Sequence, residues 1–279
     1  MDSSRWRPSP RTLCRVRALA LLIACAEAPA AQEAPRHALP PVTVRGAALD
    51  AVEKSYRRMV RGMDHFERRR AAVAPGAALR FKLLPRQRGT DMDRIVLEVI
   101  GTTFSRRVPV AADHTFVLGR DPRAWQEDAV VSPDRRRLSM TWRTEIRTPG
   151  LPAGTRRLGD LRLECEVGLE AGLVSNSSPL GRIADVFRDT TSYCDRPDTQ
   201  YLFFAERPLF SVTLVAGARR EVLPLERLYA GASDDPRLAD DLPYCDCEVL
   251  VDRTYYLPLG DHGWPDDTRV EFEYMDTPP

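Results

Sequence analysis

The chain is poor in the residues and motifs that carry familiar enzyme chemistry. It has only four histidines among 279 residues. It contains no G-x-S-x-G nucleophile motif, no H-E-x-x-H zinc motif and no glycine-rich phosphate loop after an expected strand. A catalytic site needs a nucleophile with a base, or a metal with an open coordination position. The sequence therefore favours a binding protein over an enzyme, and it indicates no cofactor.

An excess of charge of either sign is also lacking. The chain has 41 basic and 40 acidic side chains. Residues 1–30 hold five of the basic and two of the acidic ones, which leaves 36 basic and 38 acidic in the remainder. Such a near-neutral balance argues against nucleic acid as the main ligand. No later run approaches 18 apolar residues, so we expect no membrane-spanning helix.

Residues 1–30 have the composition of an export signal. Five arginines accompany a short apolar core, Ala18–Ala24, which is too short to be a permanent membrane span. Ala28-Pro29-Ala30 matches the cleavage site of the general signal peptidase, which we slightly favour. The alternative is Leu22-Ile23-Ala24-Cys25, which resembles the lipobox of bacterial lipoproteins and implies a lipid anchor on Cys25. Either route leads to the periplasm or to the periplasmic face of the outer membrane.

Residues 31–46 are rich in alanine and proline, so we expect a tether. The tether ends in Leu39-Pro40-Pro41-Val42-Thr43-Val44-Arg45-Gly46, which resembles the TonB box and plug start of TonB-dependent outer-membrane receptors. That resemblance implies a contact with TonB. The remaining chain is too short for the large barrel of those receptors, and their following plug motifs are missing. We therefore interpret the segment as an extended arm.

The rest of the chain begins with one amphipathic helix and continues as strands. Apolar residues recur with helical spacing over residues 47–72, and arginines occupy the opposite, solvated face. We place His65 at the surface or edge of this helix. After Pro75-Gly76 the period changes to two, with turn residues between short segments. The sequence predicts a mainly β protein with two sandwich-like halves, residues 47–180, which include the helix, and residues 181–279.

Cysteines occur in two segments with strand-like alternation, Leu161–Val167 and Cys245–Val251. In a regular strand, Cys245 and Cys247 lie at or beyond the usual distance for a disulfide. Four cysteines allow three pairings, and the sequence leaves all three open. The pairing that we favour is Cys165–Cys247 with Cys194–Cys245.

Zinc binding is the alternative role for these cysteines, with His262 as a further ligand. Structural zinc sites usually have two clusters of ligands at short spacing, and the chain has no second pair of that kind. An exported protein enters an oxidising compartment, where cysteines form disulfides. We therefore favour disulfides over a metal site.

The best candidate for a binding site is a loop near the C-terminus. Its carboxylates suit a cation, and its indole suits the face of a sugar. The alternative, which we favour, is a turn in which aspartates cap the main chain and the tryptophan packs on the core. The candidate residues are Asp261, His262, Trp264, Asp266 and Asp267.

These observations predict an exported protein of the bacterial cell envelope. We expect a non-catalytic binding or interaction module that recognises an envelope protein or a glycan. The alternative is a hydrolase, or a metal- or carbohydrate-binding protein, with its site in the loop of residues 261–267.

Overall fold

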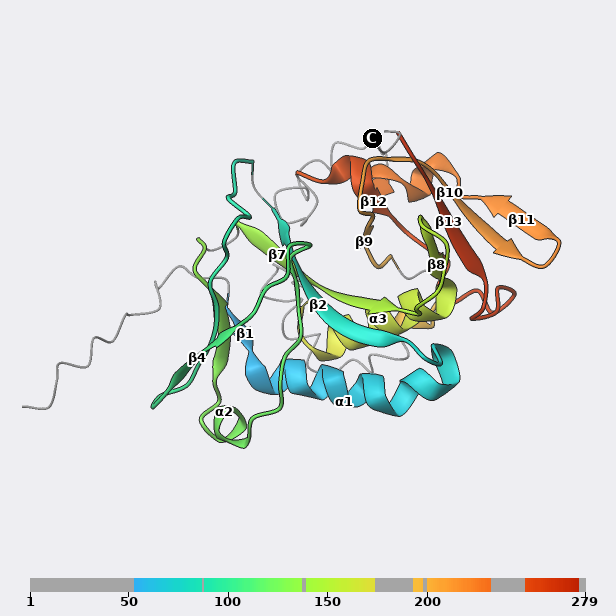
Figure 1. The fold of residues 1–279 in the computed structure, drawn as a ribbon. Helices are drawn as coiled ribbons and strands as arrows, with labels where there is room; N and C mark the ends of the chain where they lie inside the picture. Colours follow the sequence, from blue (N-terminus) through green and yellow to red (C-terminus); the bar gives the residue numbers. More distant parts are fainter. Residues whose placement is uncertain are drawn as a thin grey trace, which may run out of the picture. The chain divides into compact units, whose positions relative to one another are not determined.

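The computed structural model describes residues 53–86, 88–136, 139–173, 193–197, 200–231 and 249–275. Within these residues the protein is mainly β, with several antiparallel sheets and three α-helices (Figure 1). The expected class is confirmed at that level, and the arrangement as two sandwich-like halves stays a prediction. The signal segment, the tether, Cys25, Cys245 and Cys247 lie outside the described residues.

The sheet that positions the site has the strand order β5-β2-β7. Its strands are β2 (Ala78–Pro85), β5 (Thr115–Phe116) and β7 (Met140–Arg147). Phe81 lies opposite Thr144, and Leu83 lies opposite Trp142, in one unbroken antiparallel register. The side chains of Phe81, Leu83 and Trp142 are buried, as the alternation predicts. They give the sheet one apolar face, which the helices cover.

Helix α1 (Tyr56–Val73) packs on this apolar face. Its first turn is capped by Ser55, whose hydroxyl accepts a hydrogen bond from the Arg58 N–H at 3.3 Å. The described helix begins later than the expected residue 47, because Lys54–Ser55 forms the short strand β1. The side chains of Met59 and Val60 lie in one core cluster with those of the sheet.

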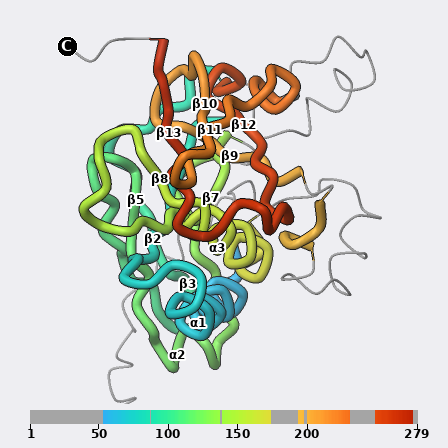
Figure 2. The backbone as a smooth tube through the Cα atoms, turned by 90° about the vertical axis from the view of Figure 1, so that its right-hand side faces the viewer, coloured from blue at the N-terminus to red at the C-terminus, as the bar shows by residue number. Residues whose placement is uncertain are grey.

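The segment Leu161–Val167 is a correction to the sequence analysis, because it belongs to helix α3 (Leu158–Glu170) and not to a strand. Glu164 and Glu166 are buried along with the apolar residues, so the alternation does not mark an inner and an outer face. Helix α3 lies beside α1 (Figure 1, Figure 2). A Cβ atom at Gly62 would lie 2.7 Å from the Cβ of Ala171, so glycine at position 62 permits this close approach.

The disulfide is a second correction. Cys165 on α3 is bonded to Cys194, with 6.0 Å between their Cα atoms. The favoured pairing of each with a cysteine of the 245–247 segment is therefore wrong. It depended on placing Cys245 and Cys247 in a strand, where each would need a partner elsewhere, and these two residues lie outside the described part of the chain. Helix α3 instead directs Cys165 into a core cluster that also holds Cys194. The bond fixes residues 193–197 to α3.

A second sheet has the order β11-β10-β13-β8. Strand β8 directly precedes α3 in the chain and pairs with β13, near the C-terminus, so segments on both sides of residue 181 form one sheet. The division into residues 47–180 and 181–279 stays a prediction. The strands of this sheet are β8 (Thr155–Arg157), β10 (Leu209–Ala216), β11 (Arg219–Val222) and β13 (Arg269–Tyr274).

The remaining elements are short. Strand β9 pairs with β12, and another sheet has the order β1-β6-β3-β4. Among the described residues, no helix is long and apolar enough to cross a lipid bilayer. The bounds are β3 (Leu97–Ile100), β4 (Ser105–Val108), α2 (Pro122–Gln126), β6 (Val130–Pro133), β9 (Phe203–Phe204) and β12 (Thr254–Tyr255).

Candidate functional site

The loop predicted as a site, residues 261–267, is held in place by Arg162 of α3. The Arg162 guanidinium forms an ion pair with Asp266 at 2.6 Å. It also donates, at 2.8 to 2.9 Å, to the main-chain carbonyl oxygens of Leu259, Asp261 and Trp264. The fork of donors on an arginine matches such a set of acceptors. Asp266 is thus engaged in holding the loop.

The other carboxylates of the loop do not converge on one point. Asp261 Oδ1 accepts a hydrogen bond from the Gly263 N–H at 2.8 Å, and Asp267 is exposed. Trp264 is 1% exposed, and the Arg219 guanidinium carbon lies 3.6 Å from its ring centre. Across the described residues, no group of three or more His, Cys, Asp or Glu could hold a metal ion. The loop therefore shows turn chemistry and core packing.

His262 lies at a small cavity between the loop and the disulfide. Its Nε2 atom is 3.2 Å from Asp195 Oδ1, and both side chains are largely exposed. The cavity has a volume of about 300 Å³, and Cys194 and Trp264 also line it. The structure thus places the predicted loop beside residues of α1 and α3, which are distant from it in sequence.

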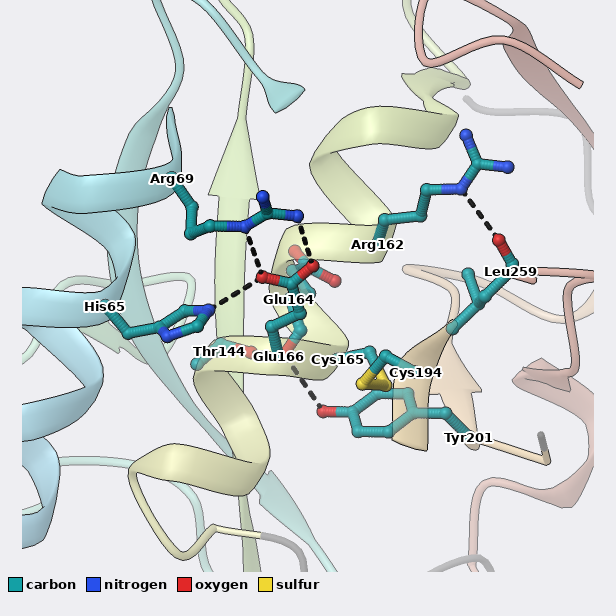
Figure 3. The surroundings of a disulfide bond; sticks show 10 residues. All are labelled: His65, Arg69, Thr144, Arg162, Glu164, Cys165, Glu166, Cys194, Tyr201 and Leu259. Atoms are coloured by element: carbon teal, nitrogen blue, oxygen red, sulfur yellow. Dashed lines mark hydrogen bonds and ion pairs between the residues drawn. A yellow bond between two sulfur atoms is a disulfide. The ribbon is translucent and has the colours of Figure 1, made fainter. Parts of the chain in front are cut away.

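On the wall of this cavity, Glu166 of α3 binds two residues of α1 (Figure 3). His65 Nε2 lies 2.7 Å from Glu166 Oε2, and Arg69 donates to both carboxylate oxygens at 3.1 Å. His65 is expected at the surface or edge of the helix, but it is 7% exposed, so the surface position is wrong. Burial raises the pKa of Glu166, but hydrogen bonds with His65 and Arg69 outweigh burial and hold that pKa below its usual value.

A larger cavity, of about 680 Å³, lies against the polar face of the β5-β2-β7 sheet. Side chains that alternate with the apolar ones form one wall, among them Lys82, Arg143 and Glu145. Residues 201–206 lie on the wall as well, together with Arg253. Known ligand pockets have volumes of roughly 300 to 1,000 Å³, so this cavity has the size of a binding site.

The charged side chains of this wall are paired with one another. Glu145 lies 3.3 Å from Lys82 Nζ and 2.8 Å from Arg147 Nε. Arg147 Nη2 reaches Glu206 Oε1 at 2.6 Å. Burial raises the pKa of Glu145, but the charges of Lys82 and Arg147 outweigh burial and lower it. The Arg143 guanidinium carbon lies 4.7 Å from the ring centre of Phe204.

A buried ion pair, Arg156 with Glu164, also lines the cavity. Arg156 Nη2 lies 2.6 Å from Glu164 Oε1 and 2.7 Å from the Ile146 carbonyl oxygen. The Ile146 N–H donates to the same carboxylate at 2.6 Å. Burial raises the pKa of Glu164, and the Arg156 charge offsets only part of this effect. Burial also raises the pKa of Tyr201, on the same wall, to about 12.

No motif in the sequence predicts a role for the residues of the large cavity. The sequence feature that bears on this cavity is the alternation in β7. It places Arg143, Glu145 and Arg147 on one face and Trp142 and Ile146 on the other. That pattern predicts a solvated face. It does not predict that residues 201–206, which are distant in sequence, lie against this face and form a cavity.

No protein-family model, no curated protein and no solved structure matches this chain. The geometry of its own cavities is therefore the basis for assigning a function.

Proposed function

We propose that this chain is an exported, non-catalytic binding protein of the bacterial cell envelope, and that its ligand occupies the large cavity beside β7. The observation that carries the proposal is the cavity itself. Its volume of about 680 Å³ is bounded by charged side chains on one wall and by aromatic ones such as Phe203 and Phe204 on another. Pockets with a few placed polar groups and an apolar lining are the usual form of binding sites.

Export is supported by the composition of residues 1–30 and by the disulfide. A signal of this kind leads to an oxidising compartment, where a bond such as Cys165–Cys194 persists. The body that carries the cavity is mainly β, and we propose that it is arranged as two sandwich-like halves. Cleavage after Ala30 or lipidation of Cys25 would leave this body in the periplasm or on the periplasmic face of the outer membrane.

Binding is favoured over catalysis because the carboxylates of the cavity are neutralised by partners. Glu145, Glu164 and Glu206 each have an arginine or lysine nitrogen within 2.6 to 3.3 Å. A general base must accept a proton from the substrate, and the charges of Lys82 and Arg147 lower the pKa of Glu145 and make it a weak base. Glu164 Oε1 already accepts hydrogen bonds from Arg156 and from the Ile146 N–H. Such pairs suit the orientation of a ligand that carries both donors and acceptors.

A matched pair of variants on one exposed loop tests the proposal. Ala112 lines the cavity, whereas Ala111, its exposed neighbour, is not part of the wall. We expect Ala112→Trp to fill the cavity mouth and Ala111→Trp to leave it open. The mature protein and both variants would be heated with amino acids, short peptides, oligosaccharides and fatty acids in turn. We expect at least one class to raise the Tm of the wild type and of Ala111→Trp, but not of Ala112→Trp. Equal responses of all three proteins would overturn the proposal.

A hydrolase is the second candidate, favoured by one observation. His262 and Asp195 lie 3.2 Å apart at the mouth of the smaller cavity, which is the geometry of a base with its orienting carboxylate. Panels of p-nitrophenyl esters and glycosides would test it with the wild type and His262→Ala. We expect equal background rates for the two proteins. A turnover that His262→Ala loses, with its fold intact by circular dichroism, would replace the binding function with a hydrolytic one.

A further inference from the structure

The free edge of β7 points toward the large cavity. In an antiparallel pair, successive residues direct their main-chain N–H and C=O groups alternately toward the partner strand and away from it. The Leu83 N–H donates to the His114 carbonyl on the β5 side. The main-chain N–H and C=O groups of Leu83 and Phe81 therefore point toward β5 and away from β7. Their opposite residues, Trp142 and Thr144, therefore present their main-chain groups to the free edge.

Thr144 is the open position on that edge. At its neighbour along the edge, Ile146, both main-chain groups are taken by Glu164 and Arg156. Thr144 is 5% exposed and lines the cavity, and within the described residues its main-chain N–H and C=O have no hydrogen-bond partner. Buried main-chain groups without a partner are rare, so a ligand or water must complete them.

Strand β9 presents a similar edge on the opposite wall. The Ala205 N–H donates to the Arg253 carbonyl at 2.8 Å, so the main-chain groups of Ala205 point toward β12. Those of its neighbour Phe204 therefore point away from β12. Phe204 lines the cavity, and in the described part of the chain its main-chain groups also lack a partner. Arg143 bridges the two walls by placing its guanidinium over the Phe204 ring.

We propose that the ligand of the large cavity is an extended peptide segment, whose main chain bonds to Thr144 on one side and to Phe204 on the other. This inference rests on the proposed function and names its ligand class. An extended peptide presents donors and acceptors on both edges, which is the complement of two free strand edges. A fatty acid has no such groups along its chain.

The cavity has room for the peptide to continue. A second cavity, of about 310 Å³, shares Arg147, Phe204 and Glu206 with the first. The Arg147–Glu206 ion pair therefore lies where the two cavities meet, and both of its side chains are partly exposed. An exposed pair contributes little to stability, so a bound chain can displace it at low cost. The ion pair then supplies one charge of each sign to the side chains or termini of the peptide.

Selection from a phage-displayed random heptapeptide library, with the mature protein as bait, would supply the probe. A selected peptide would be synthesised as a series in which each amide in turn is replaced by an ester, which removes one N–H and keeps every side chain. We expect replacement at one or two central positions to weaken binding about tenfold or more. Ala112→Trp should abolish binding, and Ala111→Trp should retain it. Amide hydrogen exchange at Thr144 and Phe204 should slow when the peptide binds.

The failure of this inference is distinguishable from the failure of the proposed function. If amino acids, sugars or fatty acids stabilise the protein through the cavity and no peptide does, the binding function stands and the peptide class is wrong. If a peptide binds but every ester variant keeps its affinity within about threefold, the main-chain hydrogen bonds are not used and the inference is overturned.

Discussion

The guanidinium of Arg156 lies 2.6 Å from the carboxylate of Glu164, in a place where neither side chain is more than 8% exposed. Between them they bind both main-chain groups of Ile146 on the edge of β7. The pair therefore ties β8 and α3 to β7, and both of its side chains line the large cavity. The same two side chains therefore stabilise the fold and form part of the candidate site.

Removing one member of this pair should destabilise the protein strongly. Arg156→Met leaves the Glu164 carboxylate buried without its cation, and the loss should be about 3 to 5 kcal/mol of unfolding free energy. Adding Glu164→Gln removes the buried charge and keeps an acceptor for the Ile146 N–H, so the double variant should be more stable than Arg156→Met alone. Urea denaturation followed by circular dichroism measures both.

The control for that prediction is an exposed ion pair. Glu67 and Arg70 on α1 lie 3.4 Å apart and are about half exposed, at 54% and 46%. Glu67→Gln should change the unfolding free energy by less than about 0.5 kcal/mol, because water screens this pair. Equal losses for Glu67→Gln and Arg156→Met would contradict the role given to burial.

Glu166 should contribute to acid sensitivity. Its pKa in the folded protein is below the usual 4.5, so it stabilises the fold above that pH, and the stabilisation is lost as pH falls through the lowered pKa. Glu166→Gln should be less stable than the wild type near neutral pH, and the difference should shrink as the pH is lowered to about 3. Urea midpoints across that range provide the test. If the difference in urea midpoint between the wild type and Glu166→Gln stays constant across that range, the carboxylate does not titrate as proposed.

The Cys165–Cys194 bond should contribute about 2 to 4 kcal/mol, since it closes a loop between residues 29 positions apart. Replacing both cysteines with alanine should lower the urea midpoint by a matching amount. Peptide mapping of the oxidised wild type should recover Cys165 and Cys194 in one linked pair of peptides. Recovery of Cys165 linked to Cys247 would show that the bond described here is not the native one.

Arg162 should matter for the loop of residues 261–267 more than any carboxylate within it. Arg162→Met removes hydrogen bonds to three carbonyl oxygens and to Asp266, and it should cost about 2 to 3 kcal/mol and speed amide exchange in the loop. Asp267→Ala, at an exposed position, should stay within about 0.5 kcal/mol of the wild type. Hydrogen exchange by mass spectrometry measures both. A larger loss of stability in Asp267→Ala than in Arg162→Met would contradict the role given to Arg162.

The sequence predicts the β class and several strands because their inner and outer faces differ in polarity. Strand β7 is an example, with Trp142 and Ile146 inward and Arg143 and Glu145 on the other face. For helix α3 the same reasoning predicts a strand, which is wrong. The helix is buried nearly all round, and its glutamates are paired with distant arginines and a histidine, so its sequence carries no clear helical period.

The candidate site is predicted less well than the fold, for a related reason. The loop of residues 261–267 is predicted as a binding site because aspartate, histidine and tryptophan lie close in sequence. In the structure, Asp266 forms an ion pair with Arg162 of α3, and this pair holds the loop in place. The large cavity depends on residues 201–206 lying against a face built from β2 and β7. Such a contact between distant segments leaves no periodic signal in the chain.

Native mass spectrometry of the mature protein, isolated from the envelope fraction of cells that produce it, tests the binding function most directly. We predict a species heavier than the oxidised polypeptide by the mass of a bound ligand, and we expect tandem fragmentation to identify that ligand as a peptide. The added mass should persist in Ala111→Trp and be missing from Ala112→Trp. Wild-type and Ala112→Trp spectra that differ only by the substituted residue would contradict a ligand in the cavity beside β7.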